Sequence, residues 1–193
     1  NRYQLQSDGK AEYNKFDRAL SIRRKITLGI SLEEQLRDDP TFAALPQKEF
    51  EKKVDEYKKE YLRPLECIDR YLEYLNREGL YDTISSGVSD REGRWKAFLD
   101  YSAVYAQFQD PKRLAQMGLR EREIGHVEDA AFKIIRKREL ATSHSGQSTG
   151  LPKVHKIMRD LPKILRDEIA RKELLKLRDI PIELPKDERR DKQ

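Results

Sequence analysis

The sequence contains a single cysteine, Cys67, and no long run of apolar residues. One cysteine excludes an intramolecular disulfide and any zinc site built from several cysteines. No apolar stretch approaches the roughly 18 to 20 residues that a membrane-spanning helix requires, and no signal-peptide pattern is present. These absences favour a cytoplasmic protein held together by an ordinary hydrophobic core, which a chain of 193 residues is long enough to build.

Motifs typical of catalysis and of cofactor binding are also missing. The sequence has no Gly-rich phosphate loop, no HExxH and no nucleophile elbow, and its histidines, His126, His144 and His155, are too scattered to indicate a triad or a metal site. Cys67 shares a helical side with two tyrosines, which favours a packed thiol over a reactive one. The sequence therefore predicts no catalytic residue, no metal ligand and no cofactor.

Charge, by contrast, is abundant. Asp, Glu, Lys and Arg make up 39% of the residues and the mean hydropathy is −0.91, yet apolar residues recur at helical spacing, so the chain is predicted to fold. The formal net charge is +5 and the pI about 9.1. Residues 1–30 and 119–193 are basic and residues 31–87 are acidic. An anionic partner is therefore expected to meet the ends of the chain.

Apolar residues at three- and four-residue intervals predict an all-α fold, a multi-helix orthogonal bundle with no convincing strand. A turn-rich sequence, DTISSGVSD, predicts a boundary between two helical subdomains. The expected organisation is a first subdomain at residues 1–87, a second at residues 88–180 and a flexible charged tail at residues 181–193.

Prolines and glycines predict several details of these helices. A long apolar stripe begins near Phe50; we expect Pro64 to kink or divide its helix and Gly79 to end it. Two short helices are expected on either side of Pro162. The segment ATSHSGQSTG, residues 141–150, is interpreted as a mobile loop.

The stretch KITLGISLEEQL, residues 25–36, predicts a corner between two helices. Gly29 is the expected end of the first helix, and Ser31 with Glu34 forms a capping box for the second. Ile26 is expected on the inner face of the first helix. The corner is typical of the entry to a helix-turn-helix, although the segment DDPTFAALPQ that follows is longer than the tight form of that motif allows.

Basic residues form clusters that are candidates for phosphate contacts. The clearest is Lys156, Arg159, Lys163 and Arg166, whose spacing stacks four cations on one ridge if the helix continues past Pro162. For the other clusters, a solvated or salt-bridged face fits the sequence as well as DNA contact does. The complete set of predicted DNA contacts is Arg23, Arg24, Lys25, Lys48, Lys52, Lys133, Arg136, Lys137, Lys153, Lys156, Arg159, Lys163 and Arg166.

Residues 11–80 resemble part of a known family. AEYNKFDRALSIRRKITLGISLEEQL is similar to the segment of ParB-type partition proteins in which a helix runs into a helix-turn-helix, and YLRPLECIDRYLEYLNREG is similar to the helices that follow. The resemblance implies a central DNA-binding region, of use in plasmid or chromosome partition, downstream of a ParB domain that this chain lacks. The family's nucleotide-binding motifs belong to that domain and match nothing here.

Three functions remain open at this point. The first is non-enzymatic DNA binding through basic helix faces, with homo-oligomers possible and no membrane involved. The second is a helical protein-interaction or oligomerisation module, for which mixed-charge surfaces serve equally well. The third is the regulatory helical part of a larger enzyme. Steep salt dependence separates the first from the second, because only DNA binding releases counterions.

Overall fold

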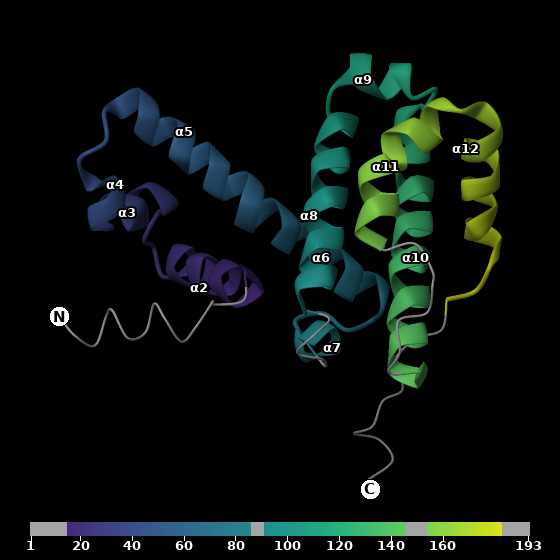
Figure 1. The fold of residues 1–193 in the computed structure, drawn as a ribbon, viewed down its shortest axis with the longest axis horizontal. Helices are drawn as coiled ribbons and strands as arrows, with labels where there is room; N and C mark the ends of the chain where they lie inside the picture. Colours follow the sequence, from purple (N-terminus) through teal and green to yellow (C-terminus); the bar gives the residue numbers. More distant parts are fainter. Residues whose placement is uncertain (1–14, 86–90, 146–153, 183–193) are drawn as a thin grey trace, which may run out of the picture. The chain divides into compact units, whose positions relative to one another are not determined.

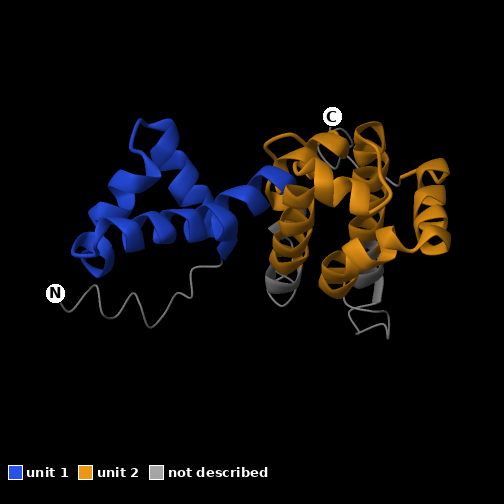
Figure 2. Ribbon diagram, turned by 90° about the horizontal axis from the view of Figure 1, so that it is seen from above, with its two compact units in different colours: residues 1–67 blue, residues 68–193 orange. Residues whose placement is uncertain are grey.

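The computed structural model of the chain describes residues 15–85, 91–145 and 154–182 (Figure 1). This part of the chain is all-α and contains no strand, as the sequence predicts. The chain forms two compact units, residues 1–67 and residues 68–193 (Figure 2). The expected boundary between residues 87 and 88, and the expected tail beyond residue 182, lie outside the described residues.

Unit 1 is a small helical bundle. Its helices are α2 (Lys15–Thr27), α3 (Leu32–Arg37), α4 (Pro40–Ala43) and α5 (Gln47–Tyr57). The side chains buried among them come from α2, α3, α5 and the turn that follows α5: Phe16, Ala19, Ile22, Leu32, Leu36, Phe50, Val54 and Tyr61. Burying a large apolar side chain stabilises a fold by about 1.5 to 3 kcal/mol. This core therefore holds together helices that are individually too short to be stable in water.

The corner at Gly29 forms as expected and is well defined. Gly29 has φ +91°, its N–H donates to the carbonyl of Ile26, and the N–H of Ile30 donates to the carbonyl of Lys25. These two bonds are the Schellman ending of a helix, which requires a left-handed residue at this position. The capping box of the next helix is also confirmed, because the Ser31 hydroxyl accepts from the Glu34 N–H and the Glu34 carboxylate accepts from the Ser31 N–H.

A π-helical turn, Lys58–Leu62, connects α5 to α6 (Arg63–Tyr74), so Pro64 does not divide the helix. Pro64 has no N–H to donate and its ring crowds the preceding turn. In the wider π turn the N–H of Arg63 instead reaches the carbonyl of Lys58, five residues earlier. The helix accommodates its proline by this local change of hydrogen bonding. The division between the two units falls inside α6.

Unit 2 contains the remaining helices. They are α7 (Asp82–Ser85), α8 (Arg91–Phe108), α9 (Pro111–Gln116), α10 (Ile124–Ser145), α11 (Val154–Arg166) and α12 (Glu168–Leu175), with 3-10 turns at Glu121–Glu123 and Lys176–Asp179. An aromatic cluster marks the core, where the ring of Phe132 lies within 6 Å of the rings of Tyr71, Tyr74 and Tyr101. Helix α11 packs along α8, and α12 packs against α10 and α11 (Figure 1).

Four details of the expected helices are wrong. Helix α6 ends at Tyr74, with Asn76 as the left-handed residue at φ 54°, and Gly79 lies in a later turn. Helix α10 extends to Ser145, so the first half of the expected loop is helical, and residues 146–150 lie outside the described part. A single helix, α11, contains Pro162. Ile26 is exposed, and Ile22, one turn earlier, is the last buried residue of α2.

Candidate nucleic-acid interface

A row of basic side chains lies on the exposed side of α11. Lys156, Arg159, Lys163 and Arg166 are all exposed. At 100° per residue they fall within an arc of about 80°, and a rise of 1.5 Å per residue spreads them over about 15 Å. We call these four residues the α11 ridge. The opposite side of the same helix is buried in unit 2 through Met158, Leu161 and Leu165.

The ridge exists because α11 continues through Pro162. A proline inside a helix costs about 3 kcal/mol, since one backbone hydrogen bond is lost and the ring crowds the preceding turn. Three fully buried apolar side chains on α11 offset that cost, at about 1.5 to 3 kcal/mol each. Tertiary packing therefore overrides the local tendency of Pro162 to break the helix. The four cations were predicted to share one ridge only if the helix continues past Pro162, and it does.

The ridge is only weakly neutralised. Asp160 lies beside it, 4.0 Å from Arg159 Nε and 3.9 Å from Lys163 Nζ. Exposed ion pairs at such distances contribute little, because water screens them and both side chains lose freedom. Lys156 and Arg166 form no ion pair with any residue that the structure describes. The surface is therefore available to an anion such as a phosphate group.

A pair of largely buried titratable groups lies between α8 and α11. His155 Nδ1 is 3.8 Å from Asp100 Oδ2 of α8. Burial raises the pKa of Asp100, and the positive charges of His155, Lys96 and Arg159 oppose that rise. Arg159 is thus close enough to Asp100 to stabilise its ionised form. The pair belongs to the packing between α8 and α11 and not to the exposed ridge.

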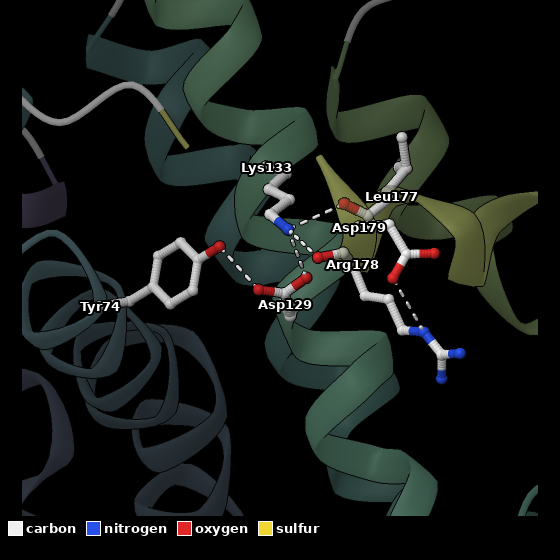
Figure 3. A network of polar contacts seen from close by, with 6 residues as sticks. All are labelled: Tyr74, Asp129, Lys133, Leu177, Arg178 and Asp179. Atoms are coloured by element: carbon white, nitrogen blue, oxygen red, sulfur yellow. Dashed lines mark hydrogen bonds and ion pairs between the residues drawn. The ribbon is translucent and has the colours of Figure 1, made fainter. Parts of the chain in front are cut away.

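Lys133 has a different environment from the one predicted. Only 11% of its side chain is exposed, and its ammonium lies 3.0 Å from the Asp129 carboxylate. It donates to the carbonyl oxygens of Leu177 at 2.8 Å and Arg178 at 2.9 Å, while Asp129 accepts from the hydroxyl of Tyr74 (Figure 3). The ammonium thus donates two hydrogen bonds and forms one ion pair within this chain. Lys133 fixes the 3-10 turn to α10, and we exclude it from the candidate interface.

The other predicted contacts in unit 2 are less informative. Lys137 is exposed one residue after Arg136, which is half-buried. Both lie on α10, so neither belongs to the ridge of α11. Lys153 lies outside the described residues. The ridge is accordingly the one predicted cluster of unit 2 whose members the structure places on a single exposed face.

The predicted contacts of unit 1 lie on α2 and α5. Arg24 and Lys25 are exposed at the end of α2, whereas Arg23 is half-buried. Lys48 and Lys52 are exposed on α5, but carboxylates surround them. Those acidic side chains are Glu49, Glu51, Asp55 and Glu56. A face of mixed charge repels phosphate as much as it attracts it, so α5 is a poor surface for reading DNA.

The sequence did not predict exposed apolar side chains at the corner of unit 1. The side chain of Gln35 donates to the carbonyl oxygens of Ile22 at 3.2 Å and Ile30 at 3.0 Å, which ties α3 to the end of α2. Leu28 beside it is among the most exposed apolar residues. A solvent-facing leucine next to a helix-ending glycine is the sequence signal that could have indicated it.

No group of three or more His, Cys, Asp or Glu side chains capable of holding a metal ion occurs in the described residues. Within the same ranges, none of the helices combines the length and apolar character needed to cross a bilayer. Comparison of the chain with protein-family models, with curated proteins and with solved structures gives no match.

Proposed function

We propose that this chain binds DNA without catalysing a reaction, through contacts between the α11 ridge and the phosphate backbone. The observation that supports the proposal is the exposed, weakly neutralised row of Lys156, Arg159, Lys163 and Arg166 on one uninterrupted helix. Duplex DNA carries about one negative charge per 1.7 Å of its axis, so a row of cations about 15 Å long meets several phosphates at once.

Phosphate contacts of this kind position a protein on DNA and carry no sequence information. We therefore propose binding with little dependence on base sequence. The ParB-like assignment and a cytoplasmic location are part of the same proposal. The corner at Gly29, with its Schellman ending and capping box, agrees with the helix-turn-helix entry on which that resemblance is based.

The experiment is fluorescence anisotropy of the whole chain with a labelled random duplex across a salt series. If all four cations contact phosphates, the slope of log K against log salt should be about −3.6, since each contact contributes about −0.9. Replacement of Lys156, Arg159, Lys163 and Arg166 by Ala should abolish most of the binding and of its salt dependence.

A matched control removes the same amount of charge elsewhere. Lys58, Lys59 and Lys172 are exposed and Lys53 is half-buried. All four are ion-paired, Lys53 with Glu56, Lys58 with Glu33, Lys59 with Asp55 and Lys172 with Glu168. Their replacement by Ala removes four positive charges without touching the ridge, and DNA affinity should fall much less. Equal losses in the two variants would mean that only the net charge matters. Absence of binding at low salt would overturn the proposal.

An oligomerisation module is the second candidate. Its support is the group of exposed apolar side chains beside Gly29 in unit 1. Association through such a surface should weaken much less with salt than DNA binding, which releases counterions from the phosphates.

A further inference from the structure

Exposed apolar side chains are concentrated at the corner between α2 and α3. Ile26 is 36% exposed, Leu28 72% and Ile30 41%. In the described residues, six large apolar side chains are exposed, and three of them lie within residues 26–30. Single exposed apolar residues are normal on a protein surface, but a local group of them indicates an interaction site. We call these three residues, with Gly29 at their centre, the Gly29 corner.

The Gly29 corner is held in one conformation. Its backbone is fixed by the Schellman bonds that end α2 and by the capping box that begins α3. The amide of Gln35 adds hydrogen bonds to the carbonyls of Ile22 and Ile30, on both sides of the glycine. A surface that is already ordered loses little conformational entropy on binding, and this lowers the cost of association.

Along the chain, charges of opposite sign flank the corner. Arg24 and Lys25 precede it, are exposed, and form no ion pair within the described ranges. Glu33 and Glu34 follow it and are also exposed. Glu33 contacts Lys58 at 3.4 Å, a long and solvated pair that contributes little. Hydrogen bonds from Ser31 lower the pKa of Glu34, so this carboxylate stays ionised.

We propose that the Gly29 corner binds the same corner of a second copy of this chain about a two-fold axis. A two-fold interface must be complementary to itself. Along the chain the order is basic, apolar, acidic, so two copies in antiparallel arrangement place Arg24 and Lys25 of one opposite Glu33 and Glu34 of the other. The apolar residues, led by Leu28, then meet their own counterparts at the centre. This proposal is independent of the DNA proposal, which depends on α11.

Other occupants fit this pattern less well. A DNA duplex or an anionic membrane presents negative charge over its whole surface, and Glu33 and Glu34 would be repelled by it. A second copy presents both signs in the required order. Three apolar residues from each side make a small interface, so we expect a weak dimer whose population rises with concentration.

Sedimentation equilibrium of the whole chain, from micromolar to submillimolar concentration, tests the proposal. We expect a monomer–dimer equilibrium, and we expect Leu28→Asp to raise the dissociation constant at least about tenfold. Ile169→Asp is the matched control, because Ile169 is 78% exposed on α12, away from the corner in sequence and in unit 2. It should leave the equilibrium unchanged. Circular dichroism verifies that both variants are folded.

Charge reversal identifies the partner surface. Arg24→Glu combined with Lys25→Glu should weaken self-association, and so should Glu33→Lys alone. An equimolar mixture of these two variants should associate again, because one of the two charge contacts in the mixed dimer is then the original one, Arg24 and Lys25 of one copy opposite Glu33 and Glu34 of the other. A chain that stays monomeric at all concentrations overturns the proposal, as does a dimer insensitive to Leu28→Asp. Binding of a monomeric chain to anionic phosphatidylserine vesicles, lost in Leu28→Asp, would assign the corner to a membrane instead.

Discussion

The guanidinium group of Arg171 lies against Gly118 and joins the ends of two helices. Its Nη1 atom donates to the carbonyl oxygens of Met117, at 3.1 Å, and Leu165, at 2.7 Å. Those carbonyls belong to the last turns of α9 and α11, where backbone acceptors have no partner within the helix. One side chain of α12 thus completes two helix ends, and it fixes the end of α11 that carries Arg166.

Gly118→Ala should destabilise unit 2 by about 2 to 4 kcal/mol. The backbone at Gly118 has φ +66°, and a Cβ atom there would lie 2.9 Å from Cζ of Arg171 and closer still to Nη1. The variant therefore combines left-handed strain with displacement of the arginine from its two carbonyls. Urea unfolding measures the loss.

Gly29→Ala is the matched control for this substitution. Gly29 also has a positive φ, +91°, but no atom lies within 4 Å of a Cβ placed on it. The free energy of unfolding of this variant should fall only by the backbone strain, about 1 to 2 kcal/mol. If both alanine variants lose the same free energy, Arg171 moves aside at no cost and its two hydrogen bonds do not stabilise the protein.

Lys133→Met should release the C-terminal 3-10 turn from α10. The carbonyls of Leu177 and Arg178 would lose their donor and Asp129 would lose its cation, which together should cost about 2 kcal/mol. Hydrogen exchange should accelerate at Ile180, whose N–H donates to the carbonyl of Leu177. The exposed Lys137→Met serves as the control, with an expected change within about 0.5 kcal/mol. If both substitutions lower the free energy of unfolding equally, Lys133 does not fix the 3-10 turn to α10.

The sequence predicted the features of this fold that depend on local chemistry. Only glycine reaches φ +91° without strain, so Gly29 ends its helix whatever packs around it. The capping box is likewise local, because Ser31 and Glu34 form it within four consecutive residues. The four-cation spacing of the α11 ridge is also a local pattern, since the period of a helix places residues three and four apart on one side.

The features that depend on tertiary packing were not predictable from the same patterns. Pro162 indicates a helix end by itself, and only the burial of α11 against α8 allows the helix to continue. Lys133 belongs to the predicted cluster with Arg136 and Lys137, and it is covered only because the 3-10 turn that contains Leu177 packs against it. Ile26 fits the apolar period of α2, but its helix ends before a neighbour can bury it.

Asp100→Asn should stabilise the protein above pH 7. Burial raises the pKa of Asp100, so the folded state holds its proton more tightly than the unfolded chain does. The stability that such a group contributes is fully present below its unfolded pKa, about 3.9, and is lost as the pH rises through the folded value. At high pH the ionised carboxylate therefore lowers the stability of the folded state, and replacement by asparagine removes this charge.

The advantage of Asp100→Asn should shrink toward pH 5. Histidine gains its charge in that range, and a cationic His155 at 3.8 Å pairs with the carboxylate but not with an amide. Chemical denaturation at pH 8 and pH 5 measures the difference, with the exposed Asp179→Asn as the control. A variant less stable than the original chain at pH 8 would show that Asp100 has a stabilising partner when ionised.

Arg37 holds the long turn between α3 and α5. Its Cζ atom lies 3.6 Å from the centroid of the Phe50 ring, Nη1 donates to the carbonyl of Leu45 at 3.2 Å, and Nη2 donates to Oε1 of Gln47 at 2.8 Å. A flat guanidinium stacks on the ring and directs its donors sideways at the same time. An ammonium group cannot do both, so Arg37→Lys should destabilise unit 1 by about 1 to 2 kcal/mol even though the charge is kept.

Hydrogen exchange and urea unfolding together test this role of Arg37. Exchange should accelerate at Leu45, whose N–H donates to the carbonyl of Phe42 inside the turn, and not at Gly29, whose N–H donates to Ile26 at the other corner. Lys52→Arg is the reverse substitution at an exposed position of α5 and should change the free energy of unfolding by less than about 0.5 kcal/mol. If Arg37→Lys is equally neutral, the positive charge alone holds the turn, and the stacking on Phe50 contributes nothing.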